Sequence, residues 1–167
     1  MVTLLLLVLA QTAAPSTAGS TSPCTAPEHH QFDFWIGDWE VRSAQGRVLG
    51  HNRITSILSG CALQEEWTSA DAKSRGVSHN AFDSSDGKWH QAWVDNSPSR
   101  LDLTGGLVDG RMVMEQRSRD RAGKPVVHRI TWTPLPEGRL RQAWETSTDD
   151  GATWKTAFDG YYSRKAP

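Results

Sequence analysis

The sequence has no surplus of charge of either sign. Its formal net charge is −1, and its Lys and Arg residues are scattered along the chain instead of forming a basic stripe. The densest cluster, Arg117, Arg119 and Arg121, is interrupted by Asp120. Because binding to a nucleic-acid backbone depends on concentrated positive charge, this pattern argues against nucleic acid as a partner.

Long hydrophobic runs are also lacking. The longest, MVTLLLLVLA at residues 1–10, falls short of the roughly 20 apolar residues that a membrane-spanning helix needs, so no stable membrane span is predicted. The run matches the hydrophobic region of a secretory signal with cleavage after Ala10, and the small, polar residues 11–23 are typical of a disordered leader. We therefore expect a signal peptide and leader at 1–23, a single domain at 24–167, and a periplasmic or secreted protein.

Cysteine is scarce, and the pattern of metal-binding residues is missing. The two cysteines, Cys24 and Cys61, show no C-x-x-C spacing, and the histidines show no H-x-x-x-H spacing, so no metal site and no cofactor are predicted. In an exported protein, an even number of cysteines indicates a disulfide, which would contribute about 2–4 kcal/mol to stability. The alternative is two unpaired thiols.

What the chain does contain is a regular succession of short segments with alternating apolar and polar residues from Arg47 onward. Turn residues such as Asp86-Gly87 and Asp109-Gly110 separate them at intervals of about 8–12 residues, which is typical of a sandwich or barrel. A short helix is predicted between Pro27 and Ile36, ending before Gly37. The predicted strands are residues 38–44, 47–58, 61–70, 74–83, 88–95, 100–108, 111–119, 126–133, 139–147 and 154–164.

These segments predict an all-β fold: an antiparallel up-and-down barrel of about ten strands with a short N-terminal helix. Closing such a meander removes the two exposed edges of an open sheet, and a small barrel can hold one small ligand. A two-sheet sandwich is the alternative, but it usually needs longer crossing connections than this sequence shows.

The segment FDFWIGDWEV at residues 32–41 carries a family resemblance, which continues in ILSGCALQEEW (57–67), KWHQAWVD (88–95) and RLRQAWETSTDDGATWKTAFDGYYSR (139–164). Together with GVSHNAFD (76–83), LDLTGGLVDGRMVM (101–114) and RITWTPL (129–135), these segments cover nearly the whole chain after the leader. The chain resembles a lipocalin-like family of exported bacterial proteins. The resemblance implies a calycin-type barrel with the FDFW segment closing one end, and it brings neither a substrate nor a catalytic residue.

Alternation places polar groups on the same strand faces as many of the eight tryptophans. Glu65 shares a face with Trp67, and Phe158 is expected on the face of Thr156. Polar groups among aromatic rings are what a ligand cavity uses for orientation, whereas a packed core would bond the amides to each other or to water. The candidate ligand-binding residues are Trp67, Asn80, Trp89, Gln91, Trp93, Trp132, Gln142 and Trp144.

Catalysis is not indicated by any nucleophile motif, since G-x-S-x-G is absent. Candidate bases are Glu65, which would face inward on a regular strand, and His79. For Glu65 the favoured interpretation is an ion pair with an Arg of a neighbouring strand. The sequence thus predicts an exported barrel that binds a small, partly apolar or aromatic ligand. The alternative is an isomerase or hydrolase on the same barrel that uses an interior Glu or His as base. Oligomeric state is left open.

Overall fold

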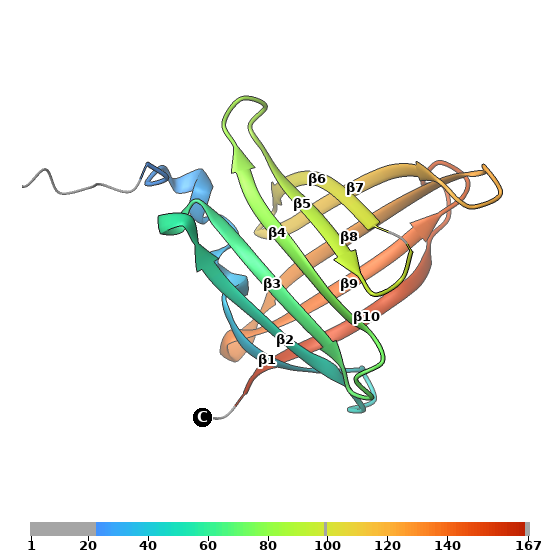
Figure 1. The fold of residues 1–167 in the computed structure, drawn as a ribbon, viewed down its shortest axis with the longest axis horizontal. Helices are drawn as coiled ribbons and strands as arrows, with labels where there is room; N and C mark the ends of the chain where they lie inside the picture. The colour runs from blue at the N-terminus through green and yellow to red at the C-terminus, as the bar shows by residue number, and fades with distance from the viewer. Residues whose placement is uncertain (1–22, 99, 166–167) are drawn as a thin grey trace, which may run out of the picture.

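The structure, a computed structural model, describes residues 23–98 and 100–165; the signal peptide and nearly all of the leader predicted at 1–23 lie outside these residues. The described residues form a closed antiparallel barrel of ten strands, as predicted, in which each strand pairs with the next and β1 pairs with β10 (Figure 1). Every strand begins and ends within two residues of its predicted bounds. The strands are β1 (Gly37–Arg42), β2 (Val48–Ile57), β3 (Ala62–Ser69), β4 (Arg75–Asp83), β5 (Lys88–Asp95), β6 (Arg100–Val108), β7 (Arg111–Arg119), β8 (Pro125–Leu135), β9 (Arg139–Ser147) and β10 (Lys155–Arg164).

The helix predicted between Pro27 and Ile36 is instead two single 3-10 turns, η1 (Pro27–His30) and η2 (Asp33–Trp35), which lie just before β1. Two similar turns, η3 (Leu58–Gly60) and η4 (Pro136–Gly138), join β2 to β3 and β8 to β9. Phe32 separates the first two turns with φ −108° and ψ 5°, which is outside the helical region. A segment this short forms no stable helix by itself, so packing of its side chains decides its shape.

Residues 32–36, just before β1, pack into one end of the barrel; we call them the plug and this end the plug end. The hairpins β2–β3, β4–β5, β6–β7 and β8–β9 lie at the plug end, and the other hairpins form the mouth end. Phe32 and Trp35 are fully buried, and their rings stack at 4.8 Å between centroids. The Phe32 ring also meets Trp132 edge-on at 5.1 Å. Aromatic rings thus fill the plug end with apolar surface.

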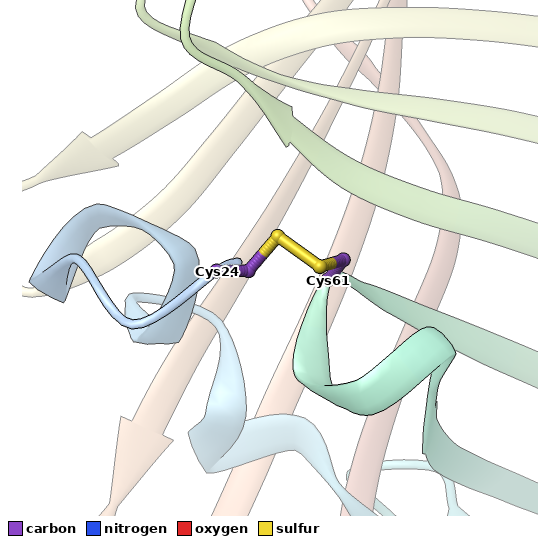
Figure 2. The surroundings of a disulfide bond; sticks show 2 residues. All are labelled: Cys24 and Cys61. Atoms are coloured by element: carbon purple, nitrogen blue, oxygen red, sulfur yellow. A yellow bond between two sulfur atoms is a disulfide. The ribbon is translucent and has the colours of Figure 1, made fainter. Parts of the chain in front are cut away.

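A disulfide ties the plug to the barrel. Cys24 and Cys61 are bonded, with their Cα atoms 5.1 Å apart, so the predicted pairing is confirmed. Cys24 precedes η1, and Cys61 lies between η3 and β3 (Figure 2). The bond therefore anchors the segment that precedes the plug to the β2–β3 hairpin at the same end.

Candidate ligand-binding cavity

A cavity of about 290 Å³ lies inside the barrel and reaches the mouth end, where Ser69, Ser74 and Asp95 border it. Its walls are largely aromatic, and polar groups lie deeper inside. The aromatic lining residues are Trp67, Trp93, Trp144 and Phe158. The polar lining residues inside the barrel are Glu65, Gln91, Gln142 and Tyr162, and the remaining ones are Leu101, Ile130 and Ala157.

Two glycines on the barrel wall make room for two of these rings. A Cβ added to Gly76 would lie 2.2 Å from Cζ2 of Trp93. One added to Gly50 would lie 2.4 Å from the backbone oxygen of Thr68 and 2.6 Å from Cη2 of Trp67. A larger residue would therefore push the Trp93 ring away from the wall at Gly76, and would displace both backbone and the Trp67 ring at Gly50. Glycine in a strand interior often marks such a close approach. The rings of Trp67 and Trp93 can therefore lie against the wall, which keeps the cavity open.

The other two rings are positioned by neighbours. The indole N–H of Trp144 donates to Nδ1 of His128 at 3.2 Å. Burial lowers the pKa of His128, which keeps its imidazole neutral and able to accept this bond at neutral pH. The Phe158 ring meets Trp67 edge-on at 5.9 Å, so one aromatic pair joins β10 and β3 across the barrel interior.

Glu65 is the centre of a buried hydrogen-bond network. Nδ2 of Asn52 donates to its Oε1 at 2.8 Å, and the hydroxyl of Ser78 donates to its Oε2 at 2.7 Å. Nε2 of Gln91 in turn donates to Oδ1 of Asn80 at 2.8 Å, and Nδ2 of Asn80 donates to the Ser78 hydroxyl at 2.9 Å. All of these partners are uncharged amides or a hydroxyl.

Burial raises the pKa of the Glu65 carboxyl to about 7, although the hydrogen bonds from Ser78 and Asn52 act in the opposite direction. The ion pair expected for Glu65 is therefore wrong: among the described residues, no Arg, Lys or His forms a salt bridge with it. Within the described part of the chain, Glu65 has no arginine partner because neighbouring residues of β2 face opposite sides of the strand. Arg53 is exposed and pairs with Asp38, while its neighbour Asn52 is buried and contacts the Glu65 carboxyl.

A second chain of contacts joins the network to β9 and β10. The hydroxyl of Tyr162 accepts from Nδ2 of Asn52 at 3.3 Å and donates to Oε1 of Gln142. Burial, and then the negative charge of Glu65, raise the pKa of Tyr162, so its hydroxyl stays protonated at neutral pH. Neither Asn52 nor Tyr162 was a candidate from the sequence. Alternation puts Asn52 on the same face of β2 as the apolar residue Ile54, and this signal could have identified it. The structure does bury Gly50, Asn52 and Ile54 together.

The cavity brings together most, but not all, of the candidate binding residues. Trp67, Gln91, Trp93, Gln142 and Trp144 line it, and so does the candidate base Glu65. Of the other candidates, Trp89 and Trp132 are buried in the apolar core at the plug end, and Asn80 lies behind the lining, bonded to Gln91.

His79 is exposed on β4 and does not line the cavity, so the idea of an interior histidine base at this position is wrong. Its neighbours Ser78 and Asn80 are buried, which leaves His79 on the opposite face of a regular strand.

A β-bulge changes the faces of β10. Thr156 pairs with Glu145, but the register then shifts and Phe158 pairs with Trp144. The extra residue, Ala157, puts Phe158 on the cavity side with Trp144, whereas alternation predicted that it would share a face with Thr156.

Outside the cavity, one exposed group could hold a cation. Asp83, Asp86 and His90, at the β4–β5 hairpin, offer ligand atoms within 4.8 Å of one another. His90 Nε2 lies 3.0 Å from Asp86 Oδ2, so these two side chains already contact each other. Exposed clusters of this kind are common, and no chemistry is assigned to this one. Among the described residues, no helix has the length and apolar content needed to cross a membrane.

Together, the fold and the site define a closed antiparallel β-barrel with an aromatic cavity and a buried carboxyl group. Compared with models of known protein families and with curated proteins, the chain matches none. The geometry of the cavity therefore carries the functional argument.

Proposed function

We propose that this protein is an exported, lipocalin-like barrel that binds a small, partly apolar or aromatic molecule in the cavity. The observation that carries the proposal is the combination of four aromatic rings, Trp67, Trp93, Trp144 and Phe158, with polar groups deeper in the same cavity. Rings supply apolar contact area, and a few polar groups fix the orientation of a ligand. The volume, about 290 Å³, is near the lower end for small-molecule sites, which favours a compact ligand.

Two further features support this class of protein. Aromatic side chains of the plug are buried at one end of the barrel and the cavity reaches the other, so the mouth end offers a ligand a route of entry. The Cys24–Cys61 disulfide favours an oxidising compartment, because disulfides persist in exported proteins and are rare in the reducing cytosol.

The test is tryptophan fluorescence of the purified protein, titrated with a library of small aromatic and alicyclic compounds. A ligand that enters the cavity should quench or shift the emission. Trp93→Leu and Trp144→Leu should each weaken its affinity by roughly 10-fold, because a lost ring contact costs about 1 kcal/mol or more. The matched control is Trp154→Phe: Trp154 stacks under Arg129 and does not line the cavity.

The proposal would be overturned by a flat response to every compound. It would also be overturned by a ligand whose affinity falls equally in the Trp154→Phe control and in the two cavity variants, since that ligand would bind elsewhere.

A second candidate function is proton-transfer catalysis, for example isomerisation or hydrolysis of the bound ligand. A carboxyl with a pKa of about 7 inside a cavity is suited to act as a general base at neutral pH. In that case Glu65→Gln should abolish turnover of a ligand identified in the library while the variant stays folded, as judged by circular dichroism, and still binds that ligand. Unchanged turnover in Glu65→Gln would remove this candidate.

A further inference from the structure

The ionisable groups that line the cavity are all acidic. Among the described residues in the lining, they are Glu65, Asp95 and Tyr162, and none is Lys, Arg or His. Burial by itself would raise the pKa of Asp95, but hydrogen bonds from Ser97 and the Trp93 indole outweigh it and leave the pKa below its usual value. This carboxyl is therefore ionised at neutral pH. The described lining of the cavity therefore carries negative charge and no positive group to offset it.

Among the residues that the structure describes, Glu65 has hydrogen-bond donors but no cationic partner. Both of its oxygens accept from neutral side chains, Asn52 and Ser78. A carboxylate oxygen has two acceptor positions, so each oxygen can still accept one more donor. Burying an ionised carboxylate without a counter-charge is unfavourable, and a positive ligand group beside it would remove that cost.

The aromatic walls favour the same charge. The faces of Trp and Phe rings carry partial negative charge and attract cations within about 6 Å, most strongly for Trp. Three tryptophans and Phe158 surround the space above Glu65. An anionic ligand would instead meet two carboxyl groups and these ring faces, and none of the described lining residues carries a positive charge to offset the repulsion.

We propose that the ligand of this cavity is a small organic amine, bound as its cation, with the ammonium group on Glu65 and its apolar part among the tryptophans. This inference rests on the proposed function, because it names the ligand class of the same cavity. It differs from that function in a measurable way: a barrel for neutral aromatic molecules would show no preference for positive charge.

Proton release follows from the same geometry. The groups that face Glu65 are Asn52 from β2, Ser78 from β4 and Tyr162 from β10, with Asp95 further out on β5. Of these, Tyr162 stays protonated, and Asp95 is ionised. In the free protein a large fraction of Glu65 is protonated near pH 7. An alkylammonium stays charged there, as lysine does with a pKa of about 10.4, so its binding must displace the Glu65 proton.

The experiment compares three probes of nearly equal size by isothermal titration calorimetry with the full mature chain: phenethylamine, phenethyl alcohol and phenylacetate. We expect phenethylamine to bind on the order of 10-fold or more tightly than the alcohol, and phenylacetate to bind most weakly. Repeating the amine titration at pH 7 in buffers with different ionisation enthalpies should show release of a fraction of a proton. Amine affinity should rise between about pH 6 and pH 8 as Glu65 ionises.

Two variants locate the charge effect. Glu65→Gln should bring the affinity for phenethylamine down to that for phenethyl alcohol. The matched control is Glu66→Gln, which removes an exposed carboxyl one residue away, and it should keep the preference. If Glu65→Gln fails to fold, as judged by circular dichroism, Asp95→Asn at the mouth replaces it and should weaken amine binding several-fold.

The outcomes separate the two proposals. Equal affinity for the amine and the alcohol, or no proton release, would overturn the amine proposal and leave cavity binding standing. Binding of neither amine nor alcohol, with a flat response across the fluorescence library, would overturn both. A preference for the amine that Glu65→Gln retains would place the cation elsewhere and overturn the assignment to Glu65.

Discussion

Gly76 offers a direct test of how the cavity is kept open. An added Cβ would lie 2.2 Å from Cζ2 and 2.4 Å from Cη2 of Trp93, distances that real Cβ atoms do not adopt. In Gly76→Ala the indole must therefore move off the barrel wall toward the cavity. Overpacking of this kind costs about 1–3 kcal/mol, and the displaced ring should also weaken ligand binding.

The matched control is Gly106→Ala on β6, where an added Cβ meets no atom within 4 Å. This change should be neutral or stabilise by about 0.4–1 kcal/mol, because alanine reduces the freedom of the unfolded chain. Urea denaturation monitored by circular dichroism gives both stabilities. Combining Gly76→Ala with Trp93→Leu removes the clash, so the double variant should recover part of the loss through a coupling of about 0.5–3 kcal/mol.

Equal stability of Gly76→Ala and Gly106→Ala would refute the reasoning, because an added Cβ meets the Trp93 ring at Gly76 and no atom within 4 Å at Gly106. A purely additive double variant would refute it as well, since the cost would then arise from some feature other than contact with Trp93.

Three further predictions concern Glu65, the disulfide and the plug. The pKa of Glu65 is raised from 4.5 to about 7 in the folded protein, so the protonated side chain stabilises the fold fully below about pH 4.5, and this stabilisation is lost as pH rises through 7. In urea titrations, the free energy of unfolding of the wild type should therefore fall by roughly 3 kcal/mol over this range relative to that of Glu65→Gln. A difference between the two proteins that does not change with pH would contradict this. Reduction of Cys24–Cys61 should lower the free energy of unfolding by about 2–4 kcal/mol, measured with and without dithiothreitol, and an unchanged midpoint would show that the bond constrains nothing. Trp35→Ala should cost about 3–5 kcal/mol because the ring is fully buried, whereas Leu58→Ala, 72% exposed, should cost almost nothing, and similar losses would argue against a packed plug.

The positions of the strands could be predicted because their signals are local. Alternation shows which face of a strand is buried, and Asp-Gly pairs mark the turns where a positive φ is needed; Gly87 and Gly110 do adopt positive φ. The disulfide was predictable from the number of cysteines and the expected compartment.

The height of a side chain along the barrel could not be predicted in the same way. Trp89 and Trp93 lie on one face of β5, yet Trp89 packs under the plug and Trp93 lines the cavity. Four residues correspond to roughly 13 Å along a strand, which is enough to separate the core from the mouth. Alternation carries no information on this distance from the plug.

The partners of Glu65 show the same limit. The sequence places a carboxyl on an inward face, but the register between strands decides what it meets. Glu65 pairs with Ile54 on β2 and with Ser78 on β4, and this register brings Asn52 within reach while Arg53 faces solvent.

The sequence by itself determined the strands, their turns, the buried faces of the regular strands and the two cysteines available for pairing, because these depend on residues close together in the chain. Only the tertiary structure decided that the barrel closes around an aromatic cavity, and that its carboxyl group has neutral partners. The bulge at Ala157, the glycines behind two rings and the register around Glu65 decide these properties, and each depends on contacts between distant parts of the chain.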